Sequence, residues 1–394
     1  MNAAFDVNRA REETPGCENV LHFNNAGAAL MPQQVLNAVT AHLKLEAAIG
    51  GYEAVEAAAE QIDRVYDAAA ELIGCSRDEI AIVENATRAW DMAFYAIPFN
   101  PGDRILTSVA EYASNFIAYL QVAQKTGARV EVIPSDADGC ISLEALERTM
   151  DERVKLVSLT HVPTNGGLVN PAEEVGAIAR RWGALYLLDA CQSVGQMPLD
   201  VNRVGCHMLS ATSRKFLRGP RGTGFLYVSR ELISQLEPPL LDVHAATWTT
   251  PDRYEIRPDA RRFENWETNY AGKIGLAVAI DYALSWGIDS IRSRVSSLAQ
   301  ELRQRLDEIP RVTVRDLGRE RSGIVTFSVD GKKPEEVRHA LREARMNVSV
   351  STARFTLLDM QRRGLQEGLV RASVHYYNTS DEIDRFCRAL QEMV

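Results

Sequence analysis

Short runs of β-branched and apolar residues alternate with helical patterns from about residue 80 of this 394-residue chain. The alternation predicts a mainly parallel sheet that is covered by helices on both faces. In such a sheet, ligands lie at the carboxyl ends of the strands. The expected strands are 80–83, 104–109, 129–133, 155–159, 184–189 and 224–228, and the expected helices between them include 112–125, 143–150 and 171–182.

The pattern changes after residue 263, where two long helical stretches are followed by short strand-like segments. The helices are expected at 273–286, 291–306, 334–343 and 380–393, and the strands at 311–315, 323–329, 348–350 and 369–373. Mixed strands with a closing helix predict a smaller α+β domain. We therefore expect a large domain over 21–270 and a small domain that combines 1–20 with 271–394.

Composition and charge exclude several classes of protein. With 44 Lys and Arg against 53 Asp and Glu, the net charge of −9 argues against a nucleic-acid partner. No apolar run is long enough to span a membrane, and the first residues lack the apolar core of a signal peptide, so we expect a cytoplasmic protein. The six cysteines are scattered without a CxxC pair and His161 has no partner at ligand spacing, so we expect reduced thiols and no metal site.

Three local features point to a phosphate-bearing cofactor. Lys215 lies in a loop with Gly219–Gly224, where the backbone can approach an anion. Asp189 ends an apolar strand, where a carboxylate could keep a pyridine nitrogen protonated. Glu84–Arg88 opens a helix directly after a strand, which is typical of an anion site. Each feature alone is also consistent with a surface turn or a helix cap, but one crevice that contains all three favours a cofactor.

Three segments carry a resemblance to a known family. Asp189–Gln192, the Lys215 loop with Gly219–Tyr227, and Arg371–Thr379 together resemble the class V aminotransferases. This pyridoxal-phosphate family includes cysteine desulfurases, selenocysteine lyases and isopenicillin N epimerase-like proteins. The similarity runs in the same order from about Phe23 to the C-terminus. The resemblance implies the α/β fold of type I, with a mainly parallel seven-stranded sheet in the large domain. It also implies a homodimer with shared active sites and an amino acid as the substrate.

The resemblance also implies roles for individual residues. Lys215 is the residue that forms a Schiff base with pyridoxal phosphate and moves protons, and Asp189 pairs with the pyridine nitrogen. Tyr112 takes the catalytic position whose ring stacks on the cofactor. The other implied cofactor-binding positions are Ala86, Thr87, Thr164, Gln192, Thr212, Arg214 and Thr268. Thr268, or Glu267 beside it, would reach the phosphate of the neighbouring subunit. Asn25 and Arg371 are the implied substrate-binding residues, and Arg371 would clamp the α-carboxylate.

Two departures from the desulfurase pattern shape the expected reaction. Tyr112 stands where desulfurases have a histidine, and a phenol exchanges protons poorly near neutral pH. The desulfurase cysteine would fall in 350–358, where Thr356 is the closest match, and no cysteine lies between Cys206 and Cys387. We therefore expect a C–S β-lyase for a cysteine S-conjugate or sulfoxide, and we exclude a persulfide-forming desulfurase. Transamination and epimerisation are the alternatives, and a catalytically silent cofactor-binding protein is the alternative of another class.

Two further segments carry weaker expectations. The basic segment 257–264 could meet an acidic substrate, but a solvated loop or a subunit contact is the more common outcome for such a segment. The pair Tyr376–Tyr377 is expected in the core rather than in a pocket.

Overall fold

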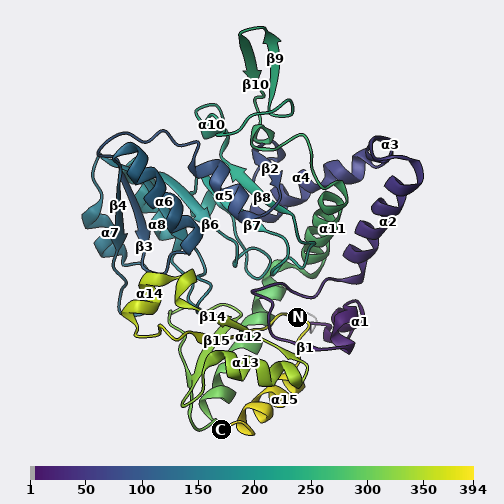
Figure 1. Ribbon diagram of the computed structural model, residues 1–394, viewed down its shortest axis with the longest axis vertical. Helices are drawn as coiled ribbons and strands as arrows, with labels where there is room; N and C mark the ends of the chain where they lie inside the picture. The colour runs from purple at the N-terminus through teal and green to yellow at the C-terminus, as the bar shows by residue number, and fades with distance from the viewer. Residues whose placement is uncertain (1–4) are drawn as a thin grey trace.

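A seven-stranded sheet forms the centre of the computed structural model, which describes residues 5–394 (Figure 1). Its strand order is β2-β8-β7-β6-β5-β3-β4, and β8 runs antiparallel to its neighbours β2 and β7 while the other neighbouring pairs are parallel. The mainly parallel sheet is thus confirmed, although β7 was not expected. The strands are β2 (Ile80–Val83), β3 (Arg104–Ser108), β4 (Arg129–Ile133), β5 (Val154–Thr160), β6 (Leu185–Asp189), β7 (Met208–Thr212) and β8 (Gly224–Val228).

Both faces of this sheet are covered by helices, so its central strands β5, β6 and β7 are buried along almost their whole length. Successive residues of a strand point to opposite faces, and Leu187 and Leu188 of β6 accordingly lie in two different core clusters. The first cluster also contains residues of α4, α8 and α11, and the second contains residues of α5 and α6. The helices of this part are α4 (Ala59–Ile73), α5 (Ala86–Phe94), α6 (Ala113–Thr126), α7 (Leu143–Thr149), α8 (Ala172–Arg181), α9 (Val201–Val204), α10 (Arg230–Ile233) and α11 (Tyr270–Trp286).

A four-stranded antiparallel sheet in the order β11-β12-β15-β14 forms the second unit. The N-terminal segment joins it, because β1 (Leu21–His22) pairs with β13 (Met346–Asn347). Tyr376 and Tyr377 are buried here, as expected. The other elements are α1 (Val7–Glu12), α12 (Ile288–Asp307), β11 (Val312–Val314), β12 (Ile324–Val329), α13 (Pro334–Glu343), β14 (Ser349–Ser351), α14 (Leu357–Arg362), β15 (Leu369–Ser373) and α15 (Ser380–Gln391). Since α11 packs on α4 and α2, the domain boundary near residue 270 stays a prediction.

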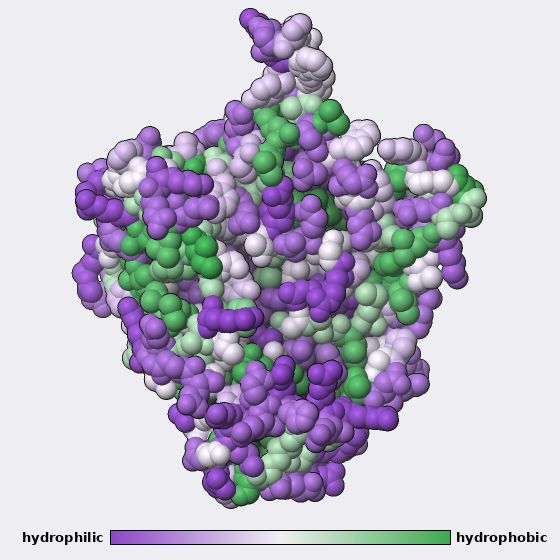
Figure 2. Space-filling model, viewed as in Figure 1, coloured by the Kyte–Doolittle hydropathy of each residue, from purple (hydrophilic) through white to green (hydrophobic). Residues whose placement is uncertain are grey.

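Two parts of the chain project from the body. The hairpin of β9 (Ala246–Thr250) and β10 (Arg253–Ile256) stands out at the top of Figure 1, and the space-filling view in Figure 2 shows it free of the rest of the surface. On the right of both views, α2 (Gln33–Ile49) and α3 (Gly51–Ala57) extend outward, with apolar surface along α2. Among the described residues, no single helix combines the length and apolar character of a membrane span; α11 and α12 meet that test only as a pair bent by 78°.

Candidate active site

A cavity lies at the carboxyl ends of β5, β6 and β7, where ligands of open α/β sheets bind. Its wall contains nine of the ten predicted cofactor-binding residues. These are Ala86, Thr87, Tyr112, Thr164, Asp189, Gln192, Thr212, Arg214 and Lys215. The site residues are therefore collected from five separate segments of the chain, and only the folded sheet brings them together.

One end of the cavity is the N-terminus of α5. Asn85 caps this helix by accepting a hydrogen bond from the backbone N–H of Arg88 at 2.9 Å. The first N–H groups of a helix have no partner within the helix and attract anions. Gly224 of β8 passes so close that a Cβ atom there would lie 2.5 Å from the Ala211 carbonyl oxygen and 3.2 Å from the Ala86 nitrogen. With Thr212 and Arg214 beside it, this end fits a phosphate group.

Lys215 follows β7 and extends into the cavity. Its Nζ donates a hydrogen bond to the Sγ of Cys191 at 3.3 Å. Burial lowers the pKa of Lys215, the thiol of Cys191 opposes this, and Arg214 adds to the lowering by repulsion. The lowered pKa increases the fraction of neutral amine, which is the nucleophilic form.

Asp189 closes the floor of the cavity at the end of β6. Its Oδ1 accepts a hydrogen bond from the Cys191 backbone N–H at 3.0 Å, and its Oδ2 accepts one from Asn115 Nδ2 at 3.1 Å. Gln192 lies beside it; its Nε2 donates to the Ala26 carbonyl oxygen at 3.2 Å. Among the residues that the structure describes, the Oε1 of Gln192 is buried without a hydrogen-bond partner, so it is available to accept a hydrogen bond from a ring hydroxyl.

Aromatic and cationic groups lie at and next to the cavity. Tyr112 is the N-cap residue of α6, and its ring lies parallel to Phe355, with the ring centroids 6.4 Å apart and an angle of 6° between the planes. Arg371 of β15 donates to the Thr164 carbonyl oxygen at 3.1 Å. Burial, with repulsion from Arg214, lowers the pKa of Arg371 to about 10, so it stays charged at neutral pH. Its Nε is buried and has no hydrogen-bond partner within residues 5–394, which leaves a donor for a carboxylate.

Three predicted site residues do not line the cavity: Arg371, which contacts its wall through Thr164, and two that lie elsewhere in the single chain. Asn25 is fully buried and does not line the cavity; its Nδ2 donates to the Ser373 carbonyl oxygen at 2.7 Å, and its Oδ1 accepts from Tyr377. Thr268 lines a separate hollow with Glu46 and Tyr52. A substrate-binding role for Asn25 and a contact of Thr268 with a second subunit both stay predictions.

The sequence reasoning missed several polar groups that the fold brings to the site. Asn115, Thr160 and Cys191 line the cavity, and Glu111 is buried behind it. A local signal existed for one pair: Glu111 lies two residues before the start of α6, and Asn115 lies in the first turn of that helix, so the two side chains are close enough to form the hydrogen bond that links them.

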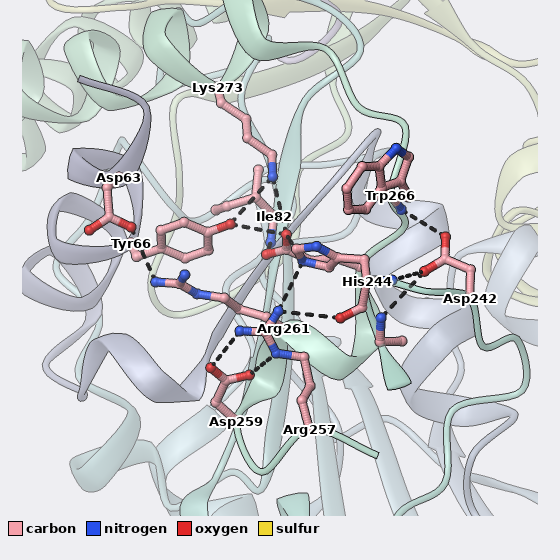
Figure 3. Close-up of polar contacts among 12 residues, drawn as sticks. Asp63, Tyr66, Ile82, Asp242, His244, Arg257, Asp259, Arg261, Trp266 and Lys273 are labelled. Atoms are coloured by element: carbon pink, nitrogen blue, oxygen red, sulfur yellow. Dashed lines mark hydrogen bonds and ion pairs between the residues drawn. The ribbon is translucent and has the colours of Figure 1, made fainter. Parts of the chain in front are cut away.

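The basic segment 257–264 is not a solvated loop. Glu264 is 1% exposed and Arg262 is 7% exposed. A cluster surrounds the Glu264 carboxylate: Lys273 Nζ lies 3.1 Å from its Oε2, the Tyr66 hydroxyl donates to it at 3.0 Å, and His244 Nε2 lies 3.3 Å away. Figure 3 shows Lys273, Tyr66 and His244 pointing toward one another. The expectation of a solvated loop was wrong because composition gave no sign of the buried lysine that pairs with Glu264.

Comparison with known proteins identifies the family. The family described as aminotransferase class-V matches residues 21–386. The chain belongs to this family. A probable cysteine desulfurase of Methanothermobacter thermautotrophicus is 31% identical over 388 residues and covers 97% of both chains. A probable cysteine desulfurase of Pyrococcus abyssi is 30% identical over 391 residues, which are 98% of this chain and 96% of the relative. The apo structure of a cysteine desulfurase from Thermococcus onnurineus NA1 has a TM-score of 0.91 at 28% identity and covers 100% of this chain and 99% of its own.

These comparisons correct the expected reaction of this class V aminotransferase relative. We expected a C–S β-lyase for S-conjugates or sulfoxides and excluded persulfide-forming desulfurases, whereas the full-length relatives carry the name cysteine desulfurase. The exclusion relied on the absence of cysteine from the segment around Thr356. It overlooked a thiol in another part of the site, because Cys191 lines the cavity next to Lys215.

The expected fold, enzyme class and cofactor are confirmed for this family member. The cavity fits pyridoxal phosphate on its own observations: a helix N-terminus with a close-passing glycine at one end, an amine with lowered pKa, a carboxylate at a strand end, and the unpartnered Oε1 of Gln192. The role of each residue toward the cofactor is a proposal, which we develop next.

Proposed function

We propose that this protein is a pyridoxal-phosphate-dependent cysteine desulfurase, which converts L-cysteine to L-alanine and transfers the sulfur to a thiol. The observation that carries the proposal is the full-length similarity to relatives of that name, together with a cavity that contains Lys215, Asp189 and a thiol. The reaction balances as cysteine plus a thiol giving alanine plus a persulfide.

The cofactor, when bound, supplies an electron sink for the carbanion at the substrate Cα. Lys215 would hold it and would accept the α-proton on Nζ, for which its lowered pKa leaves a neutral amine available. Asp189 would face the ring nitrogen and keep it protonated. Arg371 would bind the substrate carboxylate through its free Nε, since its other contact to Thr164 already fixes the guanidinium plane.

The sulfur acceptor is the part of the proposal that depends on thiols. Cys191 is the cysteine in the cavity wall. Burial raises the pKa of Cys191, and Lys215 opposes this through its charge and its hydrogen bond. A cysteine attacks the sulfur of the substrate in its thiolate form. The positive charge of Lys215 would favour the thiolate form of Cys191. The alternative sulfur acceptor is a thiol that enters the site from solution. The experiment below distinguishes this acceptor from Cys191.

We also propose a homodimer in which each subunit completes the partner's site. Leu36, Leu43 and Ile49 of α2 are 46–51% exposed, and Tyr52 is 71% exposed. Large apolar side chains gathered on one projecting helix are typical of a protein interface. Thr268 opens into the hollow beside these helices, which fits a contact with a second subunit. A molar mass of twice 43.7 kDa in light scattering is expected. A cytoplasmic location stays a prediction from the sequence.

The test is a product analysis of the cofactor-loaded enzyme with L-cysteine and dithiothreitol. Equal amounts of alanine and sulfide support the proposal, and pyruvate with ammonia in place of alanine overturns it. Lys215→Ala serves as the inactive control. Cys191→Ser identifies the acceptor: loss of sulfide release assigns the persulfide to Cys191, whereas retained release with dithiothreitol assigns it to the solution thiol.

A further inference from the structure

A second buried carboxyl group lies behind Asp189. Glu111 is 3% exposed and sits between the end of β3 and the start of α6. Burial of a carboxylate is unfavourable unless hydrogen bonds satisfy it. The proposed mechanism gives Glu111 no direct contact with cofactor or substrate, so its retention in the core beside the site needs another explanation.

Donors surround both oxygens of Glu111. Its Oε2 accepts from Thr107 Oγ1 at 2.7 Å and from the Tyr119 hydroxyl at 3.2 Å. Its Oε1 accepts from the Tyr112 backbone N–H at 2.7 Å, from Asn115 Nδ2 at 2.9 Å and from the hydroxyl of Thr160. These donors come from β3, α6 and β5. The carboxyl group is therefore fixed in place by the same strands and helix that carry the site.

Asn115 connects this group to the site. Its Nδ2 donates to Glu111 Oε1 at 2.9 Å and to Asp189 Oδ2 at 3.1 Å. Both hydrogens of the amide are thus used by two carboxyl groups, and both carboxyl groups accept from the same nitrogen. An amide turned the other way would present its oxygen to Asp189, so the bond to Glu111 fixes the orientation that supports Asp189.

We propose that Glu111 is a positioning residue, which acts through Asn115 to orient the Asp189 carboxylate and to strengthen its hold on a proton at the pyridine nitrogen of the cofactor. The chain Glu111–Asn115–Asp189 places a second carboxyl group in line behind the first. In a low-dielectric site, such networks of hydrogen bonds have large effects on the group at their end. The inference rests on the cofactor assignment in the proposed function and not on the identity of the substrate.

The charges around Glu111 agree with this role. Burial raises the pKa of Glu111, the hydroxyls of Thr160 and Thr107 lower it, and the charge of Asp189 raises it further, so that its pKa lies above the ordinary value. The two carboxyl groups therefore interact electrostatically as well as through Asn115. Other charged groups facing Asp189 are Lys215 and, next to it, Arg214, which come from the loop after β7.

The test uses the protein loaded with pyridoxal phosphate that carries ¹⁵N at the ring nitrogen, because the NMR resonance of this atom reports its protonated fraction directly. Asp189→Asn provides the reference for a site that no longer holds the proton. Glu111→Gln, which keeps the size but removes the charge, is expected to lower the protonated fraction at a fixed pH. The affinity for the cofactor is expected to fall by about tenfold, as for other groups that orient a ligand-binding side chain.

A double-mutant cycle separates positioning from general loss of structure. Because Glu111 acts mainly through Asn115, Glu111→Gln in an Asn115→Ala background should change the ring-nitrogen resonance by less than it does in the wild-type background. The matched control is Glu131→Gln, a glutamate on β4 that pairs with Arg104 away from the cavity, and it should leave the resonance unchanged.

The outcomes that overturn the inference are equally direct. An unchanged resonance in Glu111→Gln, with a clear change in Asp189→Asn, refutes it, and so do additive effects in the cycle. If Glu111→Gln does not take up the cofactor, Asn115→Ala alone decides, and an unchanged resonance there refutes the inference. None of these readouts requires turnover of cysteine, so they stand even if the desulfurase reaction proves wrong.

Discussion

Replacing Lys273 with methionine tests how the buried cluster in Figure 3 holds the segment that leads to Thr268. Lys273 and Glu264 have side chains that are 5% and 1% exposed, and their charged atoms are 3.1 Å apart. Glu264 Oε1 also accepts from the Ile82 backbone N–H at 2.8 Å, which ties the segment to β2. Methionine keeps the length and apolar stem of lysine but leaves the carboxylate without its main cation.

The size of the effect follows from burial. At this separation, the direct attraction is about 5 kcal/mol for an effective dielectric constant of about 20, and much of it offsets the cost of removing both charges from water. Removing one partner leaves the other charged and buried, which typically costs about 3–5 kcal/mol. We therefore expect Lys273→Met to lower the free energy of unfolding by about 3–5 kcal/mol at pH 7. The double variant with Glu264→Gln should lose less, because no unpaired charge remains.

The pH dependence has a definite sign. Burial alone raises the pKa of Glu264, but Lys273, His244 and the Ile82 N–H outweigh it, so the folded pKa lies below its usual value. In the wild type, the stabilisation that ionised Glu264 contributes is fully present at pH values above the pKa of this group in the unfolded chain. It is lost as the pH falls through the pKa of Glu264 in the folded protein. Without Lys273, burial dominates and protonation of Glu264 relieves the unpaired charge. The difference between the two proteins should therefore shrink as the pH falls from 7 toward 4.

Urea unfolding of the cofactor-free proteins between pH 4 and pH 7 measures this difference. Arg148→Met, which breaks an exposed pair with Glu144, is the control and should cost less than about 1 kcal/mol. A loss below about 1 kcal/mol for Lys273→Met at pH 7, or a difference that grows on acidification, would show that the cluster is not a stabilising buried ion pair.

Three further predictions concern the cavity. Lys215→Ala should bind pyridoxal phosphate without a covalent link, so borohydride reduction should leave no cofactor attached to the chain; an attached cofactor would place the reactive lysine elsewhere. Arg371→Lys should raise KM for cysteine by about tenfold or more with the cofactor affinity unchanged, since one ammonium cannot replace a guanidinium fork; an unchanged KM would refute the carboxylate role. Gly224→Ala should weaken cofactor binding, because its Cβ would meet the Ala211 carbonyl oxygen at 2.5 Å, and calorimetric titration that finds wild-type affinity would contradict this.

Local residue patterns were sufficient to predict most of the strands and helices. A strand such as 224–228 is bounded by a glycine and filled with apolar residues, and a helix such as 334–343 begins with proline, so both were predicted at the residues where the structure has them. The β7 strand at 208–212 escaped prediction because its serine and threonine make it look like a polar loop. Its polar side chains are buried against the cavity and the neighbouring strands, and a residue pattern does not show that.

The reaction was the part that local reasoning misjudged. The segment around Thr356 lacks a cysteine, and that absence was taken to exclude desulfurases, although the thiol of Cys191, two residues after the end of β6, lies beside Lys215. Cys191 and Lys215 are 24 residues apart in the chain. Their contact depends on how β6 and β7 pair, so a scan for a cysteine in one segment could not find it.

The sequence by itself determined the alternation of strands and helices, the order of the motifs around Asp189, Lys215 and Arg371, and with them the family, because each of these is a local pattern read along the chain. The tertiary structure decided what surrounds those residues. It placed Asn115 between two carboxyl groups, buried Glu264 against Lys273, and left the Nε of Arg371 buried without a partner among the described residues. Burial and long-range contact set the charge state and orientation of a side chain, and both arise only when distant segments pack together.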